Sequence, residues 1–295
     1  MPMRQNKEWC TGQDDDFPSS CRGYIGALSQ ALIHALDGGV IGDSEGCPAT
    51  ASPSLWRQPQ LTATQGLFEV VPDAIYQVRG LDLANMTLVE GSAGVIVIDP
   101  LISSECAAAA LALYRSHRGE RPVTMVIYSH SDVRHFGGVR GVTSGDVPII
   151  APTLHITATG QEETVDGVRM VFQLTPAEMN IFLPSMAALG LAGDATHTLR
   201  GALVRARHLT EAISMFADRS DVVFASHRWP TWGRDRVLAF LSGQRDVHAY
   251  LHDQTMRLIG KGHTGAEIAQ MLTPPGSFSQ PIPRARKPLS FRPRR

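Results

Sequence analysis

Two histidines and a carboxylate lie within six residues of one another in the polar loop at residues 129–138. The preceding residues, 123–128, are mostly β-branched or apolar and predict a buried strand, and a Gly-Gly pair closes the loop. His130, Asp132 and His135 are thereby placed at the end of a strand, where imidazole and carboxylate can bind a divalent metal ion. Taken alone, the loop is equally consistent with a solvated turn that contains two histidines.

This loop resembles the metal-binding signature of the metallo-β-lactamase superfamily, His-x-His-x-Asp-His. Its flanking residues resemble the alkyl sulfatase branch, which reads Thr-His-Ser-His-Val-Asp-His-Phe-Gly-Gly. The first and last histidines are present as His130 and His135, whereas Asp132 and Arg134 replace the second histidine and the aspartate. A guanidinium is permanently charged and has no lone pair, so Arg134 is expected to repel a dication and to pair with Asp132 or Glu178.

Later segments of the chain match other ligand positions of the alkyl sulfatases. The Ala-Glu-Met-Asn segment at residues 177–180 matches one whose glutamate binds zinc, which the resemblance implies for Glu178. A glutamate between two strands is otherwise an ordinary solvated residue. A strand at residues 221–227 ends in His227, at the position of the family's last metal-binding histidine. Gly193 stands where the family has a glutamate that bridges two metals.

The resemblance therefore implies a two-metal zinc site of which this chain keeps a part. His130 and Glu178, with Asp132 as an oxygen ligand, are expected to hold one zinc ion, so that each chain binds one ion or none. Asp132 is also the candidate catalytic residue of the loop. His135 and His227 remain from the second site, which lacks its carboxylate and its bridge.

Two further residues are implied to support the reaction. Arg200 matches an arginine that contacts the sulfate in the alkyl sulfatases, although the family's sulfate-contacting asparagine falls in a segment that is missing here. Asp99 matches an aspartate that supports the metal-binding loop from behind. An aspartate before a proline is equally an ordinary turn former. Four other histidines are expected to be structural: His155, His197, His248 and His252.

Hydrophobic patterning predicts the elements that position these residues. Short β-branched runs at residues 74–80, 85–90 and 94–99 predict a meander of strands, and the alanine-rich run at residues 103–119 predicts a helix. Residues 154–157 and 168–174 are expected to continue the sheet as further strands. Together with the strand that leads to His130, they form one half of an αββα sandwich. The expected fold class is α/β, a metallo-β-lactamase-like αββα sandwich followed by an α-helical dimerisation segment.

The chain is expected to divide into four parts. Residues 1–52 lack sustained periodicity and predict an irregular N-terminal arm with one helix near residues 25–36. Residues 53–233 form the metallo-β-lactamase-like domain. Residues 234–273 carry apolar residues at helical spacing and resemble a truncated alkyl sulfatase dimerisation domain. Residues 274–295 form a disordered Pro/Arg-rich tail.

Composition narrows the classes of function. The chain has 295 residues, 43% of them hydrophobic, and a formal net charge of −1, so it can bury a large core and is not suited to a nucleic-acid partner. It shows no signal-peptide or membrane-spanning pattern, and a cytoplasmic protein without a membrane partner is expected. Its four cysteines have no Cys-x-x-Cys spacing, which argues against a zinc knuckle or a disulfide framework.

The resemblance implies a function in this setting. It is the hydrolysis of small-molecule primary alkyl sulfate esters, such as dodecyl sulfate, by metal-activated water in a homodimer. The altered motif is expected to weaken or abolish turnover. The alternative is a catalytically inactive dimeric remnant that serves as a binding or interaction module.

Overall fold

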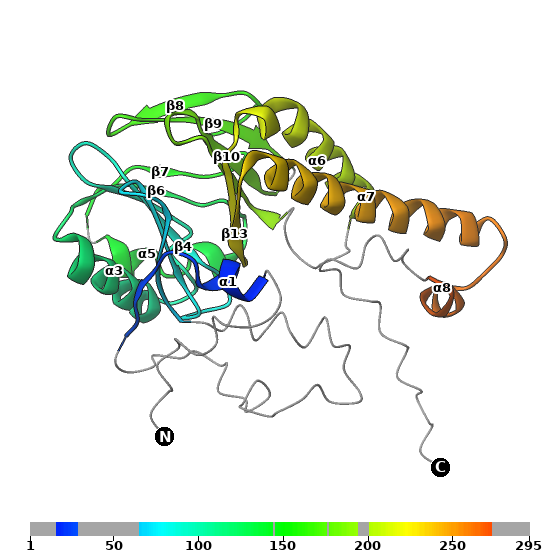
Figure 1. Ribbon diagram of the computed structural model, residues 1–295, viewed down its shortest axis with the longest axis horizontal. Coiled ribbons are helices and arrows are strands. Elements are labelled where there is room, and N and C mark those ends of the chain that lie inside the picture. The colour runs from blue at the N-terminus through cyan, green and yellow to red at the C-terminus, as the bar shows by residue number, and fades with distance from the viewer. Residues whose placement is uncertain (1–15, 29–64, 144, 176, 194–200, 273–295) are drawn as a thin grey trace, which may run out of the picture.

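Two β-sheets pack face to face, and helices cover their outer faces (Figure 1). The computed structural model describes residues 16–28, 65–143, 145–175, 177–193 and 201–272. The predicted αββα sandwich is confirmed in this part of the chain.

The first sheet follows the order of the chain. Its strands β1 to β5 pair antiparallel, whereas β5, β6 and β7 pair parallel. Parallel neighbours need a crossover, which α3 (Ser104–Arg118) supplies between β5 and β6. The carboxyl ends of β5 and β6 therefore meet at one edge of the sheet. The strands are β1 (Tyr24–Gly26), β2 (Gly66–Val71), β3 (Ile75–Arg79), β4 (Met86–Glu90), β5 (Val95–Ile98), β6 (Val123–Ile127) and β7 (Ile149–Ile150).

The second sheet has the order β13-β12-β11-β10-β9-β8. Only β11 and β12 pair parallel among its described strands, and α6 (Ala202–Phe216) crosses between them. Its strands are β8 (Glu162–Val165), β9 (Val168–Leu174), β10 (Met179–Leu183), β11 (Ala188–Leu191), β12 (Val222–Ala225) and β13 (Arg228–Trp232).

Three apolar layers hold the sandwich together. The central layer lies between the sheets and includes Ile96 of β5 and Phe172 of β9, both fully buried. Tyr114 belongs to the layer between the first sheet and α3, and Phe216 to the layer between the second sheet and helices α6 and α7. Each such side chain contributes about 1.5–3 kcal/mol by its burial, so the two sheet edges that carry the loops are rigidly placed.

The helices follow their sequence signals closely. The hydroxyl of Ser103 caps α3 by accepting from the Cys106 amide at 3.2 Å, and α3 ends at Gly119, whose φ is 83°. The predicted helical region after residue 233 contains α7 (Arg234–Ile259) and α8 (Gly265–Met271). Figure 1 shows α7 extending beyond the sheets, with α8 at its far end. The remaining short helices are α1 (Asp16–Cys21), α4 (Val133–Phe136), α5 (Val139–Val142), η2 (Pro184–Met186) and η4 (Ala217–Arg219).

The structure differs from the sequence predictions in three places. Ile25, where a helix was expected to begin, lies in β1, because the N-terminal arm adds this strand to the edge of the first sheet beside β2. Residues 154–157, expected as a strand, form a turn with a single Pro152–Ile156 bridge, and Leu154 is 74% exposed. Cys21 is disulfide-bonded, which its sequence spacing did not predict.

No helix in the described ranges is long and apolar enough to cross a membrane.

Candidate metal site

Three histidine side chains come together at the open edge of the sandwich. His130 and His135 stack with ring centroids 3.7 Å apart, and His227 meets His135 edge-on at 4.9 Å. One ring nitrogen from each of the three lies within 4.8 Å of the others, a spacing that suits a shared metal ion. His130 lies in the loop after β6 and His135 in the short helix α4 that follows, whereas His227 lies in the turn between β12 and β13, so each sheet contributes.

Hydrogen bonds orient all three imidazoles in the same way. Nδ1–H of His135 donates to Oδ2 of Asp99, and Nδ1–H of His227 donates to the carbonyl of Leu83, each at 2.9 Å. Nδ1 of His130 lies 2.6 Å from the Ser129 hydroxyl oxygen. That hydroxyl gives its one proton to Asp99, so it accepts from Nδ1–H. Nε2 of each ring is therefore left with a free lone pair.

The donor set fits a metal ion. Nε2 of His135 is buried and has no hydrogen-bond partner among the described residues, which is costly for a polar atom unless an ion binds it. Three imidazole nitrogens with an open fourth position are a ligand set typical of catalytic zinc. Burial lowers the pKa of His130 to about 3 and also lowers the pKa of His227, so both rings are neutral, as metal ligands must be.

Asp99 supports this arrangement from the end of β5. Its carboxylate accepts hydrogen bonds from the amide of Ser129 at 2.8 Å, the hydroxyl of Ser129 at 2.5 Å and the hydroxyl of Ser226 at 2.8 Å, besides the ring of His135. Burial raises the pKa of Asp99, but the hydrogen bond from His135 and those from the other donors outweigh it and hold the pKa at about 2. The Asp99 carboxylate thus forms hydrogen bonds with both segments that carry the histidines, the one after β6 and the one after β12.

Asp132 interacts with Arg134 and is not part of the histidine group. It caps α4 by accepting from the Arg134 amide at 3.0 Å, and it forms an ion pair with the Arg134 guanidinium. The hydrogen bonds from Arg134 hold the pKa of this carboxyl well below its usual range. The predicted pairing of Arg134 with Asp132 is confirmed.

Glu178 stands opposite His130 in an isolated antiparallel bridge, but its carboxylate faces Gly193 and α6. The amide of Gly193 donates to Oε2 at 2.9 Å, and Nη2 of Arg205 donates to Oε1 at 3.4 Å. The expected set of His130, Asp132 and Glu178 is therefore not the set that the structure brings together. Each of the two carboxylates is instead paired with an arginine, Asp132 with Arg134 and Glu178 with Arg205.

The other candidate residues lie away from the histidine group. Arg200 and His197 fall outside the described residues. His155 is exposed on a turn, and His248 is buried on α7, where burial and then the charge of Arg205 lower its pKa to about 4. In the part of the chain that the structure describes, no second cluster of metal-ligating side chains is found.

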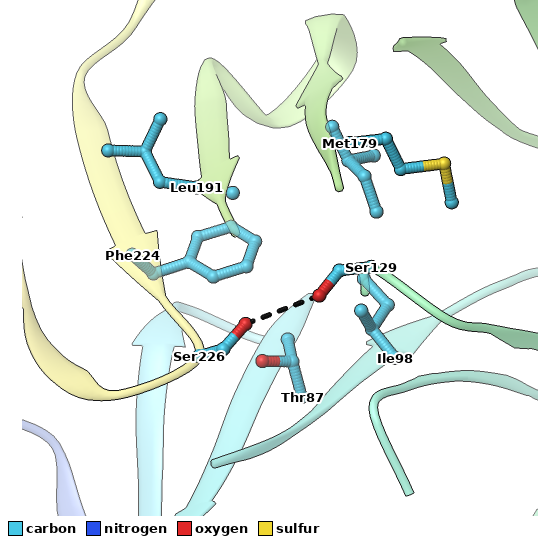
Figure 2. Close-up of a pocket in the computed structure, with 9 residues that line it drawn as sticks. Thr87, Ile98, Ser129, Met179, Leu191, Phe224 and Ser226 are labelled. Atoms are coloured by element: carbon cyan, nitrogen blue, oxygen red, sulfur yellow. Dashed lines mark hydrogen bonds between the residues drawn. The ribbon is translucent and has the colours of Figure 1, made fainter. Parts of the chain in front are cut away.

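A small, mostly apolar cavity lies between the two sheets behind the site. Figure 2 shows the hydroxyls of Ser129 and Ser226, two of the cavity's lining residues, pointing toward each other in a hydrogen bond. Their oxygen atoms lie 3.4 Å apart. Each serine immediately precedes a metal-site histidine in the sequence, so the cavity adjoins the segments that carry His130 and His227. The lining residues are Thr87, Ile98, Ser129, Met179, Ile181, Gly190, Leu191, Phe224 and Ser226.

Sequence reasoning missed three supporting residues, Ser129, Ser226 and Arg205. A signal for the serines was present, because a Ser-His pair follows a predicted strand twice, at residues 129–130 and 226–227. The contact of Arg205 with Glu178 joins residues 27 positions apart and has no comparable local signal.

Comparisons with known proteins agree with this geometry. The metallo-beta-lactamase superfamily model matches residues 79–256. The alkyl/aryl-sulfatase BDS1 of Saccharomyces cerevisiae is 35% identical over 90% of this chain and 54% of the relative. A linear primary-alkylsulfatase of Pseudomonas sp. is 38% identical over 88% of this chain and 51% of the relative. The chain spans about half the length of these curated relatives.

A solved structure is also similar. The stereoselective inverting sec-alkylsulfatase Pisa1 from Pseudomonas sp. superposes with a TM-score of 0.80 and 31% identity, covering 95% of this chain and 57% of that one.

Proposed function

We propose, since this chain belongs to the alkyl sulfatase branch of the metallo-β-lactamase superfamily, that it is a metal-dependent hydrolase of alkyl sulfate esters. The proposed site is the group of His130, His135 and His227. The proposed substrates are small-molecule alkyl sulfates, the class that the names of the relatives indicate.

The observation that carries the proposal is the common orientation of the three imidazoles. All three Nδ1 atoms are held by oxygen atoms, which leaves the three Nε2 lone pairs free, and one ring nitrogen of each histidine lies within 4.8 Å of the others. A histidine cluster formed only by core packing would have no need for this common orientation. We infer zinc as the metal and about one ion per chain, because three nitrogen ligands suit zinc.

A zinc ion bound there would supply Lewis-acid activation of water and stabilisation of charge on the sulfate oxygens. The residues of the chain prepare the site for it. Asp99 keeps the proton of His135 on Nδ1, and Ser129 and Leu83 do the same for His130 and His227. Arg200 remains the proposed sulfate contact.

Turnover is expected to be slow. Asp132, the candidate catalytic residue, has both carboxylate oxygens bonded to Arg134, so a water or a metal would compete with the guanidinium for them. Gly193 supplies no bridging carboxylate. The same observations favour a second candidate, a metal-binding protein that does not hydrolyse sulfate esters.

One experiment separates the two candidates. The purified full chain is given zinc and dodecyl sulfate, and zinc content and inorganic sulfate release are measured. We expect about one zinc per chain. Slow sulfate release is expected, with a loss of roughly a hundredfold or more in His135→Ala and His227→Ala. His155→Ala is the matched control, because His155 is exposed on a turn and is not part of the histidine group.

The outcomes have separate meanings. Zinc binding that depends on His135 and His227 without sulfate release supports the second candidate. A chain that binds no zinc contradicts both.

A further inference from the structure

A partly buried arginine from α6 holds a carboxylate beside the histidine group. Nη2 of Arg205 lies 3.4 Å from Oε1 of Glu178, and Nη1 donates to the carbonyl of Gly193. We infer that Arg205 competes with the metal ion for Glu178, so that this ion pair limits how tightly the site binds metal. The inference rests on the proposed three-histidine metal site.

Glu178 is within reach of that site. The amide of Ser131 donates to the carbonyl of Ala177 at 2.9 Å, and the amide of Met179 donates to the carbonyl of Ser129 at 2.8 Å. This pattern makes His130 and Glu178 a directly opposed pair without hydrogen bonds between them, the arrangement in which Cα atoms lie only about 4.5 Å apart. The two side chains leave the same face of the bridge, so rotation of Glu178 alone can move its carboxylate toward His130.

In the structure the carboxylate is nevertheless turned away. It accepts from Arg205 and from the amide of Gly193, and it is not part of the histidine group. Only 15% of the Arg205 side chain and 20% of the Glu178 side chain are exposed, so solvent screens this ion pair less than a surface pair. A metal ion must therefore break a partly desolvated contact before it can gain Glu178 as a ligand.

Gly193 makes room for this contact. A Cβ atom at this position would lie 2.2 Å and 2.3 Å from the two carboxylate oxygens of Glu178, closer than real atoms approach. Without a side chain, Gly193 offers its amide to Glu178 and its carbonyl to Arg205. The contact thus joins three residues from separate segments: Glu178 just before β10, Gly193 just after β11, and Arg205 in α6.

A double-mutant cycle in the full chain tests the inference. Arg205→Met removes the cation and its donors but keeps an unbranched stem. We expect its zinc dissociation constant, measured by competition with a chromophoric chelator, to fall roughly tenfold, the lower end of the effect of residues that orient metal ligands. Glu178→Gln in the wild-type background should change the constant little, because Glu178 is already engaged by Arg205.

The combined variant distinguishes release of Glu178 from a general loss of positive charge. In Arg205→Met with Glu178→Gln the gain should disappear, whereas a purely through-space effect of charge would persist. Arg207→Met is the matched control, because Arg207 is exposed on the same helix, and it should leave zinc affinity unchanged. Arg205→Lys keeps the positive charge but lacks the planar guanidinium, so it should increase zinc affinity less than Arg205→Met does. It replaces the methionine variant in the test if that variant does not fold.

Failure of the inference can be told apart from failure of the proposed function. If wild type binds zinc but Arg205→Met and Arg205→Lys bind it no more tightly, or if the gain survives Glu178→Gln, Arg205 does not compete for Glu178. If wild type binds no zinc that depends on the three histidines, the metal site itself is wrong.

Discussion

The guanidinium of Arg134 forms a bidentate ion pair with the carboxylate of Asp132. Nη2 of Arg134 lies 2.5 Å from Oδ2 of Asp132, and Nε lies 3.0 Å from both carboxylate oxygens. The pair sits between His130 and His135 in the sequence, so it places a permanent positive charge beside the proposed metal site. Half of the Arg134 side chain is exposed, and such a pair contributes at most about 1 kcal/mol to stability.

Arg134→Met should therefore change metal binding more than folding. It removes the positive charge and leaves Asp132 with free oxygens, so the zinc dissociation constant should fall about tenfold. The free energy of unfolding should change by less than about 1 kcal/mol. Zinc titration and thermal unfolding measure the two effects, with Arg140→Met, at an exposed position on α5, as control. Unchanged or weaker zinc binding would show that Arg134 does not restrict the site.

Asp99→Asn should weaken metal binding, because Asp99 orients the His135 ligand. An asparagine amide would turn either a neutral oxygen or an N–H donor toward the Nδ1–H of His135, so the ring loses its anionic partner. Loss of a residue that orients a ligand costs about 10–100-fold in metal affinity. Disruption of the buried hydrogen bonds should also cost on the order of 1–3 kcal/mol in unfolding free energy. Asp253→Asn, exposed on α7, is the control; retained zinc affinity in Asp99→Asn would contradict the assigned role.

The free energy of unfolding should decrease as the pH is lowered, because His248 is buried in its neutral form. Its side chain is 2% exposed, its Nδ1 has no hydrogen-bond partner among the described residues, and its folded pKa is about 4. Between pH 6.5 and 4 the unfolded chain binds this proton and the folded chain does not, so the stabilisation is present above pH 6.5 and is lost as the pH falls toward 4. The upper limit of this loss is on the order of 3 kcal/mol.

His248→Leu should reduce the slope of unfolding free energy against pH in that window, measured by urea unfolding at a series of pH values. His252→Gln, one turn further along α7 and more exposed, is the control for loss of an imidazole. An unchanged slope in His248→Leu would mean that other groups cause the acid sensitivity.

Restoring the family residues together, by Asp132→His, Arg134→Asp and Gly193→Glu, should raise zinc content toward two ions per chain. Single changes should do less, because metal ligands act as a set. Gly193→Glu also has a steric effect, since its Cβ atom would overlap the Glu178 carboxylate and force it away from Arg205. Elemental analysis and sulfate release from dodecyl sulfate are the measurements. If the triple variant binds two zinc ions but releases sulfate no faster, the slow turnover has its cause in other parts of the chain and not in the metal ligands.

The homodimer through residues 234–272 stays a prediction. Apolar side chains lie exposed along this region, with Met256 53%, Ile259 52% and Met271 49% exposed. Such exposed apolar residues favour association with a second copy. Light scattering at micromolar concentration should give the dimer mass for wild type and the monomer mass for Met256→Lys with Ile259→Lys. Leu154→Lys, exposed on the turn before β8, is the control. A wild-type monomer would contradict the prediction.

Local sequence determined much of the framework. The β-branched content and short spacing of the runs in residues 74–99 were sufficient for strands β3 to β5, and Ser103 and Gly119 marked both ends of α3. These signals work because backbone geometry and capping depend on neighbours in the chain. Strand β1 was missed, because a three-residue edge strand is formed by its pairing with β2 and not by its own pattern.

The site shows the same division between local and tertiary information. The sequence alone determined that His130 and His135 share a loop after a strand and that Arg134 would seek an acidic partner. The resemblance already implied a metal-ligand role for His227 and a supporting role for Asp99. Only the tertiary structure decided that His227 joins both loop histidines in one group, that Asp99 bonds to His135, and that Arg205 engages Glu178. Those contacts join the two sheets and α6 across the packed core, and the packing of these layers sets the distances between their side chains.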